Sequence, residues 1–224
     1  MKSKTKNVVM ALTLAALLLV GGVFAYLTDT DTQTNTFTMG NVEIDLTEPT
    51  WDEYPDEDNN GVPDPAEDIW AGKVIAKDPT ITNTGDNAAY VYLMVTVPKQ
   101  AVRTAQADGT PEPTPGDSTQ LFNYTVNEGW ALLKSNTSGA DENVYLYAYD
   151  TALVPGATTA TALFDEIEFV NVIEGYIGSD VTFNIPVVAY AIQSNFGAGE
   201  AGDVMTTAEA WELYANQNSI TIFD

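Results

Sequence analysis

The sequence predicts an all-β protein, a jelly-roll-like antiparallel β-sandwich with one short C-terminal helix. Three observations support this fold class: many short segments alternate between apolar and polar residues, turn-forming residues separate these segments, and only a segment near the C-terminus shows helical spacing. Hydrophobic residues make up 45% of the 224 residues, which is enough to form a core. We therefore expect one β-sandwich domain over residues 26–224.

Residues 1–25 have the composition of a cleavable signal peptide. Lysines at the extreme N-terminus precede an apolar run over residues 8–23, and a small residue ends the segment. We expect a signal peptidase to cleave between Ala25 and Tyr26. The run is shorter than the roughly 20 residues that span a bilayer. We therefore expect a secreted chain without a stable membrane span after cleavage; an uncleaved membrane anchor is the alternative.

Residues 26–39 carry threonine at every second position, and β-branched residues at this period favour a strand. The opposite face is mostly polar until its end, so the strand can bury little there and its register is weakly specified. The residues that characterise this strand are Leu27, Thr28, Thr30, Thr32, Thr34, Thr36 and Phe37.

The next strands are better defined. Apolar and acidic residues alternate over residues 41–46, which predicts a half-buried strand. A strand over residues 80–83 ends at the turn-forming residues 84–87. Residues 89–97 are apolar on both faces, which predicts a central strand covered on both sides.

The second half of the chain contains a loop, more strands and the helix. Residues 105–118 contain three prolines and are predicted to form an exposed loop inserted between strands. Pro186 indicates a bulge or an edge in the last strand. The remaining strands are predicted at residues 122–126, 130–133, 144–149, 167–170 and 181–192. Thr206 and Glu209 form a capping-box pattern. The core-facing stripe of that helix is predicted to contain Ala208, Trp211, Tyr214 and Ala215.

The sharpest chemical motif lies in the acidic segment 52–68. Residues 56–67 match the calcium-loop pattern D-x-[DN]-x-[DN]-G-x5-E, in which Gly61 permits the sharp turn. Calcium prefers a shell of carboxylate and carbonyl oxygens, which this spacing supplies. A chance match in an Asp-rich loop is the alternative. The predicted ligands of a structural Ca²⁺ are Asp56, Asp58, Asn60, the carbonyl of Val62, Asp64 and Glu67.

Composition excludes several classes of function. The net charge is −24, from 8 basic and 32 acidic residues, so we expect no nucleic acid partner and no binding to anionic membranes. The chain has no histidine and no cysteine, which excludes histidine-based catalysis, zincin motifs and disulfides, and we predict no catalytic residue. We expect Trp51, Trp70 and Trp130 in the core rather than stacked on sugars.

The stretch from Ala25 to Trp51 resembles the start of TasA/camelysin-family proteins. The shared elements are Gly21–Gly22 before the cleavage site, A-Y-[FL]-T-D after it, and N-T-F-T-x-G-N-V-x-I-x-L further on. Residues 77–90 are similar to the next strand pair of the family, and the later segment IPVVAYAIQ and the helix near residues 206–211 also fit.

The resemblance implies a jelly-roll β-sandwich and cleavage of the signal peptide by a SipW-type signal peptidase. It also implies a structural protein of the extracellular biofilm matrix or the cell surface. In such proteins the N-terminal strand of one subunit is donated to the next, and residues 26–39 occupy that place here. The implied partners are other copies of this chain or related matrix subunits. The alternatives are a camelysin-like secreted metallopeptidase and a calcium-dependent surface adhesion module.

Overall fold

The computed structural model describes residues 41–106, 108–111, 118–173, 177, 183–194 and 205–223. These residues belong to a compact unit that extends from Gly40 to Asp224. The predicted signal peptide, its cleavage site and the strand over residues 26–39 lie outside the described residues. Among the helices of the described part, none is long and apolar enough to cross a membrane.

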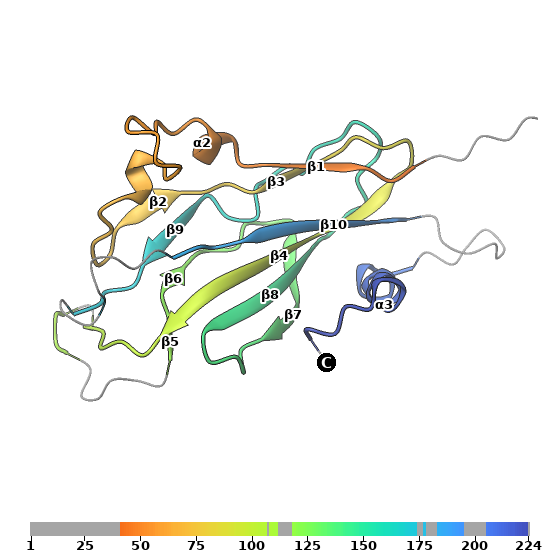
Figure 1. Cartoon of the computed structure of the whole chain (residues 1–224). Coiled ribbons are helices and arrows are strands. Elements are labelled where there is room, and N and C mark those ends of the chain that lie inside the picture. The colour runs from red at the N-terminus through yellow and green to blue at the C-terminus, as the bar shows by residue number, and fades with distance from the viewer. Residues whose placement is uncertain are drawn as a thin grey trace, which may run out of the picture. The chain divides into compact units, whose positions relative to one another are not determined.

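The described residues form an antiparallel β-sandwich with one C-terminal helix, which confirms the predicted fold class (Figure 1). One layer is the sheet β10-β4-β8-β7, with β5 paired to the end of β4; the other consists of the pair β1-β3 and the sheet β2-β9-β6. The elements are β1 (Ile44–Thr47), α2 (Pro49–Asp52), η1 (Asp64–Ala66), β2 (Val74–Ala76), β3 (Thr80–Asn83), β4 (Ala89–Gln100), β5 (Thr119–Gln120), β6 (Phe122–Asn123), β7 (Trp130–Asn136), β8 (Glu142–Tyr149), β9 (Glu166–Phe169), β10 (Val187–Gln193) and α3 (Thr207–Asn218).

Strand β4 is central, as predicted, because it separates two hydrophobic clusters. Val91 and Leu93 face the core between the two layers. Tyr90 and Tyr92 face the opposite side, where α3 covers the sheet (Figure 1). Strand β8 is divided in the same way: Tyr147 faces the core between the layers, whereas Leu146 and Ala148 belong to the cluster beneath α3. Apolar residues of both parities are thus buried.

The predicted capping box of α3 is present: the Glu209 N–H donates to Thr206 Oγ1 at 3.2 Å, and the Thr206 N–H donates to Glu209 Oε2 at 2.8 Å. The predicted stripe is partly wrong, because Ala208 is exposed and Ala210 is buried in its place. Trp211 determines this rotation, since its ring packs against Tyr92 with 5.2 Å between ring centroids.

Several strand boundaries differ from the prediction. The strand predicted over residues 122–126 ends at Asn123, because Tyr124 turns to pack its ring on Phe164 at 4.5 Å between centroids. The last strand begins only at Val187, since Pro186 has no N–H to donate to a ladder. The short strands β2 and β5 were not predicted from the sequence. Strand β7 extends to Asn136 beyond an irregularity in its register.

Candidate functional site

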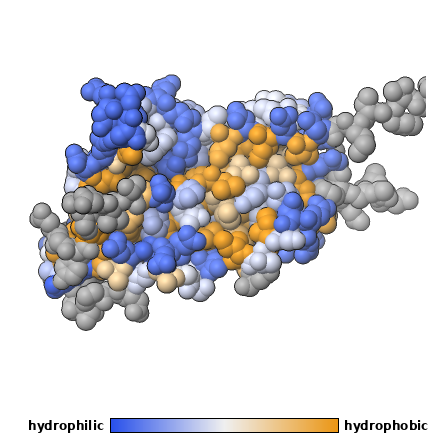
Figure 2. Space-filling model, viewed as in Figure 1, coloured by the Kyte–Doolittle hydropathy of each residue, from blue (hydrophilic) through white to orange (hydrophobic). Residues whose placement is uncertain are grey.

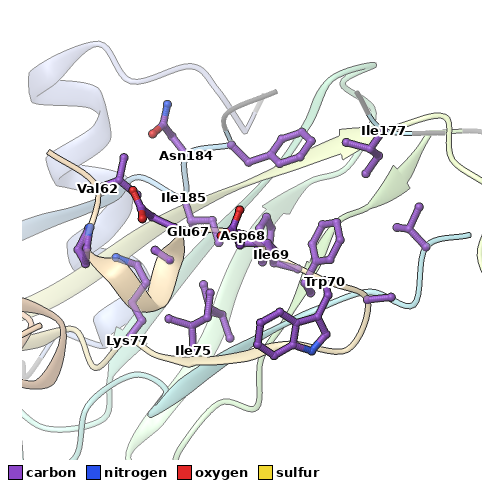
Figure 3. Close-up of a pocket in the computed structure, with 18 of the residues that line it drawn as sticks. Val62, Glu67, Asp68, Ile69, Trp70, Ile75, Lys77, Ile177, Asn184 and Ile185 are labelled. Atoms are coloured by element: carbon purple, nitrogen blue, oxygen red, sulfur yellow. The ribbon is translucent and has the colours of Figure 1, made fainter. Parts of the chain in front are cut away.

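An apolar groove of about 1340 Å³ opens where the sheet β2-β9-β6 lies across from the segment before β10. The segment over residues 61–71 and residues 183–186 form walls of this groove. Side chains from all of these segments converge on it, with Trp70 and Ile177 toward one end (Figure 3). Its floor is made of core residues that are buried themselves: Ile75, Phe122, Ile167 and Phe169.

Three phenylalanines connect the two layers at the floor of the groove. The ring centroid of Phe122 lies 5.2 Å from that of Phe169 and 6.3 Å from that of Phe183. Phe122 and Phe169 come from β6 and β9, whereas Phe183 precedes β10. The groove is therefore an opening of the sandwich core itself and has rigid, closely packed walls at its base.

The wall before β10 has the burial pattern of a strand although it is not paired as one. Phe183 and Ile185 are half-buried and line the groove, whereas Asn184 and Pro186 are exposed. The Thr96 N–H of β4 donates to the Pro186 carbonyl, which holds this segment at the end of the main sheet. The apolar face of this segment, formed by Phe183 and Ile185, therefore lines the groove but does not fill it.

Strand β2 lies at the edge of its sheet on the side away from β9. The Lys73 carbonyl accepts from Phe169 and the Lys77 N–H donates to Asp165, so the polar main-chain groups of Val74 and Ala76 point the other way. The Tyr54 hydroxyl accepts from the Ala76 N–H at 3.1 Å. Val74 is 50% exposed. Part of this strand edge is thus available for pairing.

A buried ion pair stands beside the groove. Lys77 is only 7% exposed, and its Nζ donates to both carboxylate oxygens of Glu48, at 2.7 and 2.6 Å. The same Nζ lies 4.9 Å from the ring centroid of Trp51. This contact connects the end of β1 to the end of β2, because Glu48 follows β1 and Lys77 follows β2. It fixes the groove wall formed by Trp51.

The three tryptophans expected in the core have different environments. Trp130 is buried and Trp51 is half-buried, but Trp70 is 62% exposed at the rim of the groove. The Lys73 Nζ lies 4.4 Å from the Trp70 ring centroid and donates to the Glu67 carbonyl. The expectation for Trp70 was therefore wrong, because this residue lies in the segment between η1 and β2, where the described part of the chain leaves most of its ring uncovered.

The predicted calcium loop lies next to the groove, and Val62 and Glu67 line both (Figure 3). Its aspartates accept hydrogen bonds from the loop's own main chain. Asp56 accepts from the N–H groups of Asn60 and Gly61, and Asp64 accepts from the Glu57 N–H. These bonds close the loop tightly.

Asn60 connects the remaining predicted ligands. Its Nδ2 donates to Asp58 Oδ2 at 3.0 Å and to Glu67 Oε1 at 2.5 Å, and its Oδ1 accepts from the Val62 N–H at 2.7 Å. The structure thus brings Asp58, Asn60 and Glu67 together, with Asp56 at the neighbouring turn. Within the described residues, no group of three or more acidic side chains is arranged to hold a metal ion.

Hydrophilic and apolar surfaces adjoin on this side of the molecule. In Figure 2 a strongly hydrophilic region covers the part of the chain between α2 and η1, and apolar surface begins directly beside it. The hydrophilic loop is recognisable from the sequence, but the groove is not, because the walls of the groove come from segments far apart in the chain. The alternation of Phe183 and Ile185 before Pro186 was the one local signal of an incompletely covered edge.

A family model described as camelysin metallo-endopeptidase matches residues 1–93. This match confirms the resemblance to the TasA/camelysin family over that part of the chain. No curated protein and no solved structure shows a significant match.

Proposed function

We propose that this chain, whose residues 1–93 match the camelysin family model, is a secreted structural subunit of the extracellular matrix or cell surface. After cleavage between Ala25 and Tyr26, residues 26–39 of one copy would enter the groove of the next copy and pair with the edge of β2. The observation that carries this proposal is the apolar groove beside an incompletely paired strand edge.

A chain segment fits this groove better than a small molecule does. The volume of the groove, about 1340 Å³, exceeds the roughly 300–1,000 Å³ of typical small-molecule sites. An added strand would form main-chain hydrogen bonds with the Val74 edge and place alternate side chains on the apolar floor. The alternating segment 26–39 offers a face of threonine methyl groups for that floor, and it contains no lysine or arginine.

The position of Asn41 favours donation between copies. The main chain of Asn41 bonds to Asp86 at the turn between β3 and β4, whereas Trp51 lies at the groove after the far end of β1. Asn41 therefore lies at the end of β1 that is away from the groove. A head-to-tail arrangement satisfies this geometry, and heterologous contacts of this kind produce open filaments.

We further propose that the acidic loop binds a structural Ca²⁺. The loop holds Asp58 and Glu67 together through the Asn60 amide nitrogen. If the Asn60 side chain turned over, its oxygen would join these carboxylates and a cation would replace the amide hydrogens between them. Because calcium would bind only the folded loop, it should raise the melting temperature, and Asp56→Ala or Glu67→Ala should abolish that rise. An unchanged melting temperature in millimolar calcium would remove this part of the proposal.

The fibre proposal is tested by comparing the chain that starts at Tyr26 with a shortened chain that starts at Gly40. We expect the longer chain to form filaments visible by electron microscopy, and the shorter one to stay folded but monomeric. A synthetic peptide of residues 26–39 should raise the melting temperature of the shorter chain, because it binds the folded state. Equal filament formation by both chains would refute strand donation.

Peptidase activity is the second candidate, because the description of the matching family model names a metallo-endopeptidase. The chain has no histidine, so any metal in it would need oxygen ligands. Incubation of the chain from Tyr26 with casein, with and without a chelator, tests this candidate. Chelator-sensitive cleavage that disappears when one loop carboxylate is replaced would favour it over a purely structural role.

A further inference from the structure

The tip of the acidic loop surrounds the Asn60–Gly61 peptide with the groups that a cyclisation reaction requires. We propose that this dipeptide is a self-modification site, at which the folded loop promotes conversion of Asn60 to aspartate and isoaspartate through a succinimide. Asn60–Gly61 is the only Asn–Gly dipeptide in the sequence. The inference does not depend on fibre formation or on calcium.

The nucleophile is the main-chain nitrogen of Gly61. Its N–H donates to Asp56 Oδ2 at 3.0 Å, so the Asp56 carboxylate is in position to accept the proton as a general base. Gly61 has a φ of +86°, and no atom lies within 4 Å of the position that a Cβ would occupy. The space beside the Gly61 Cα is therefore open, and glycine adopts this left-handed conformation without strain.

The electrophile is the side-chain carbonyl carbon of Asn60. The Val62 N–H donates to Asn60 Oδ1 at 2.7 Å and would stabilise the negative charge that develops on this oxygen during attack. The leaving nitrogen, Nδ2, faces the carboxylates of Asp58 and Glu67. Positive charge on the departing nitrogen is favoured between two carboxylates.

The Gly61 nitrogen gives its proton to Asp56 and forms a bond to the Asn60 side-chain carbon. The proton returns through solvent to Nδ2, the bond from that carbon to Nδ2 breaks, and ammonia leaves. Water then opens the five-membered ring at either carbonyl, which gives aspartate or isoaspartate. No oxidant, reductant or other co-reactant is needed.

The conversion would change the loop locally. The Nδ2 donor to Asp58 and Glu67 would become a carboxylate, so two hydrogen bonds would be replaced by repulsion between like charges. Isoaspartate would also lengthen the main chain at the turn. Because Val62 and Glu67 line the groove, the modification would alter one of its walls.

The test follows the whole chain in a chelator at neutral pH and compares native protein with protein unfolded in urea. Peptide mapping by mass spectrometry in oxygen-18 water would report incorporation of heavy oxygen at residue 60. We expect faster conversion in the native chain than in the unfolded one. The exposed Asn218–Ser219 peptide serves as an internal control, because its rate of conversion should be no faster in the native chain than in urea.

Two variants test whether Asp56 and the Val62 N–H accelerate the conversion. We expect Asp56→Asn to slow conversion in the native chain about 100-fold, at the low end of what a positioned base contributes. Val62→Pro, which removes the donor to Oδ1, should slow it independently, and both variants should leave the rate in urea unchanged. If the unfolded chain converts at least as fast as the native one, or if neither variant slows the native chain, the proposal is overturned.

Discussion

Replacement of Trp70 by alanine tests the groove most sharply. Trp70 is 62% exposed at the groove rim, so its removal changes the core of a single copy little. A buried aromatic side chain covers roughly 200 Å², so a donated strand would cover up to about 120 Å² of Trp70. At about 25 cal/mol per Å² this is at most about 3 kcal/mol, or about 100-fold in the concentration at which filaments form.

The assay measures filament formation by sedimentation and electron microscopy over a range of protein concentrations. If the donated strand covers only half of the exposed ring, the expected increase in critical concentration is about ten-fold. Leu132→Ala is the matched control, because Leu132 is 55% exposed but lies on β7 in the other layer. Equal critical concentrations for Trp70→Ala and the unaltered chain would refute the groove as the docking site.

Three further predictions concern stability. Trp211→Ala should lower the free energy of unfolding by about 3–5 kcal/mol, because Trp211 lies on the buried face of α3 and is only 1% exposed; thermal unfolding measures this. Thr206→Ala should remove the capping box of α3 at a cost of about 1 kcal/mol, or about 2–4 °C in melting temperature, whereas Thr206→Ser should keep most of it. Burial, and next the neighbouring Tyr147, raise the pKa of Tyr124 above its usual value of 10.0. The stability due to neutral Tyr124 should therefore be complete below about pH 10 and decline above it, and Tyr124→Phe should flatten this decline in urea titrations.

Local periodicity predicted the elements whose burial is decided locally. Residues 89–97 have apolar side chains on both faces, and the structure buries them against the second layer and α3. Thr206 and Glu209 identified the start of α3, because both halves of a capping box lie within one turn. The exact buried face of α3 was not predictable, since Trp211 sets it by contact with Tyr92 and Tyr190.

The groove could not be predicted, because it is a property of tertiary structure. Its floor joins Ile75, Phe122 and Phe169, which are far apart in the sequence. Strand β2 is three residues long, too short for a recognisable alternation. The acidic loop, in contrast, is continuous in sequence and was identified from its spacing. Sequence alone did not reveal that Val62 and Glu67 of this loop line the groove. It also did not reveal that the Asn60 side chain donates hydrogen bonds to both Asp58 and Glu67.

In the proposed fibre, the N-terminal strand of one copy occupies the groove of another. The chain contains no cysteine, so disulfide trapping has no background. One preparation would carry Ile185→Cys and a second would carry a single change at Thr30, Thr32 or Thr34 to cysteine. Mixed under oxidising conditions, the two should form disulfide-linked heterodimers at one of these positions. Failure of all three mixtures to cross-link, while chains carrying both changes form the same disulfide within one copy, would refute strand donation between copies.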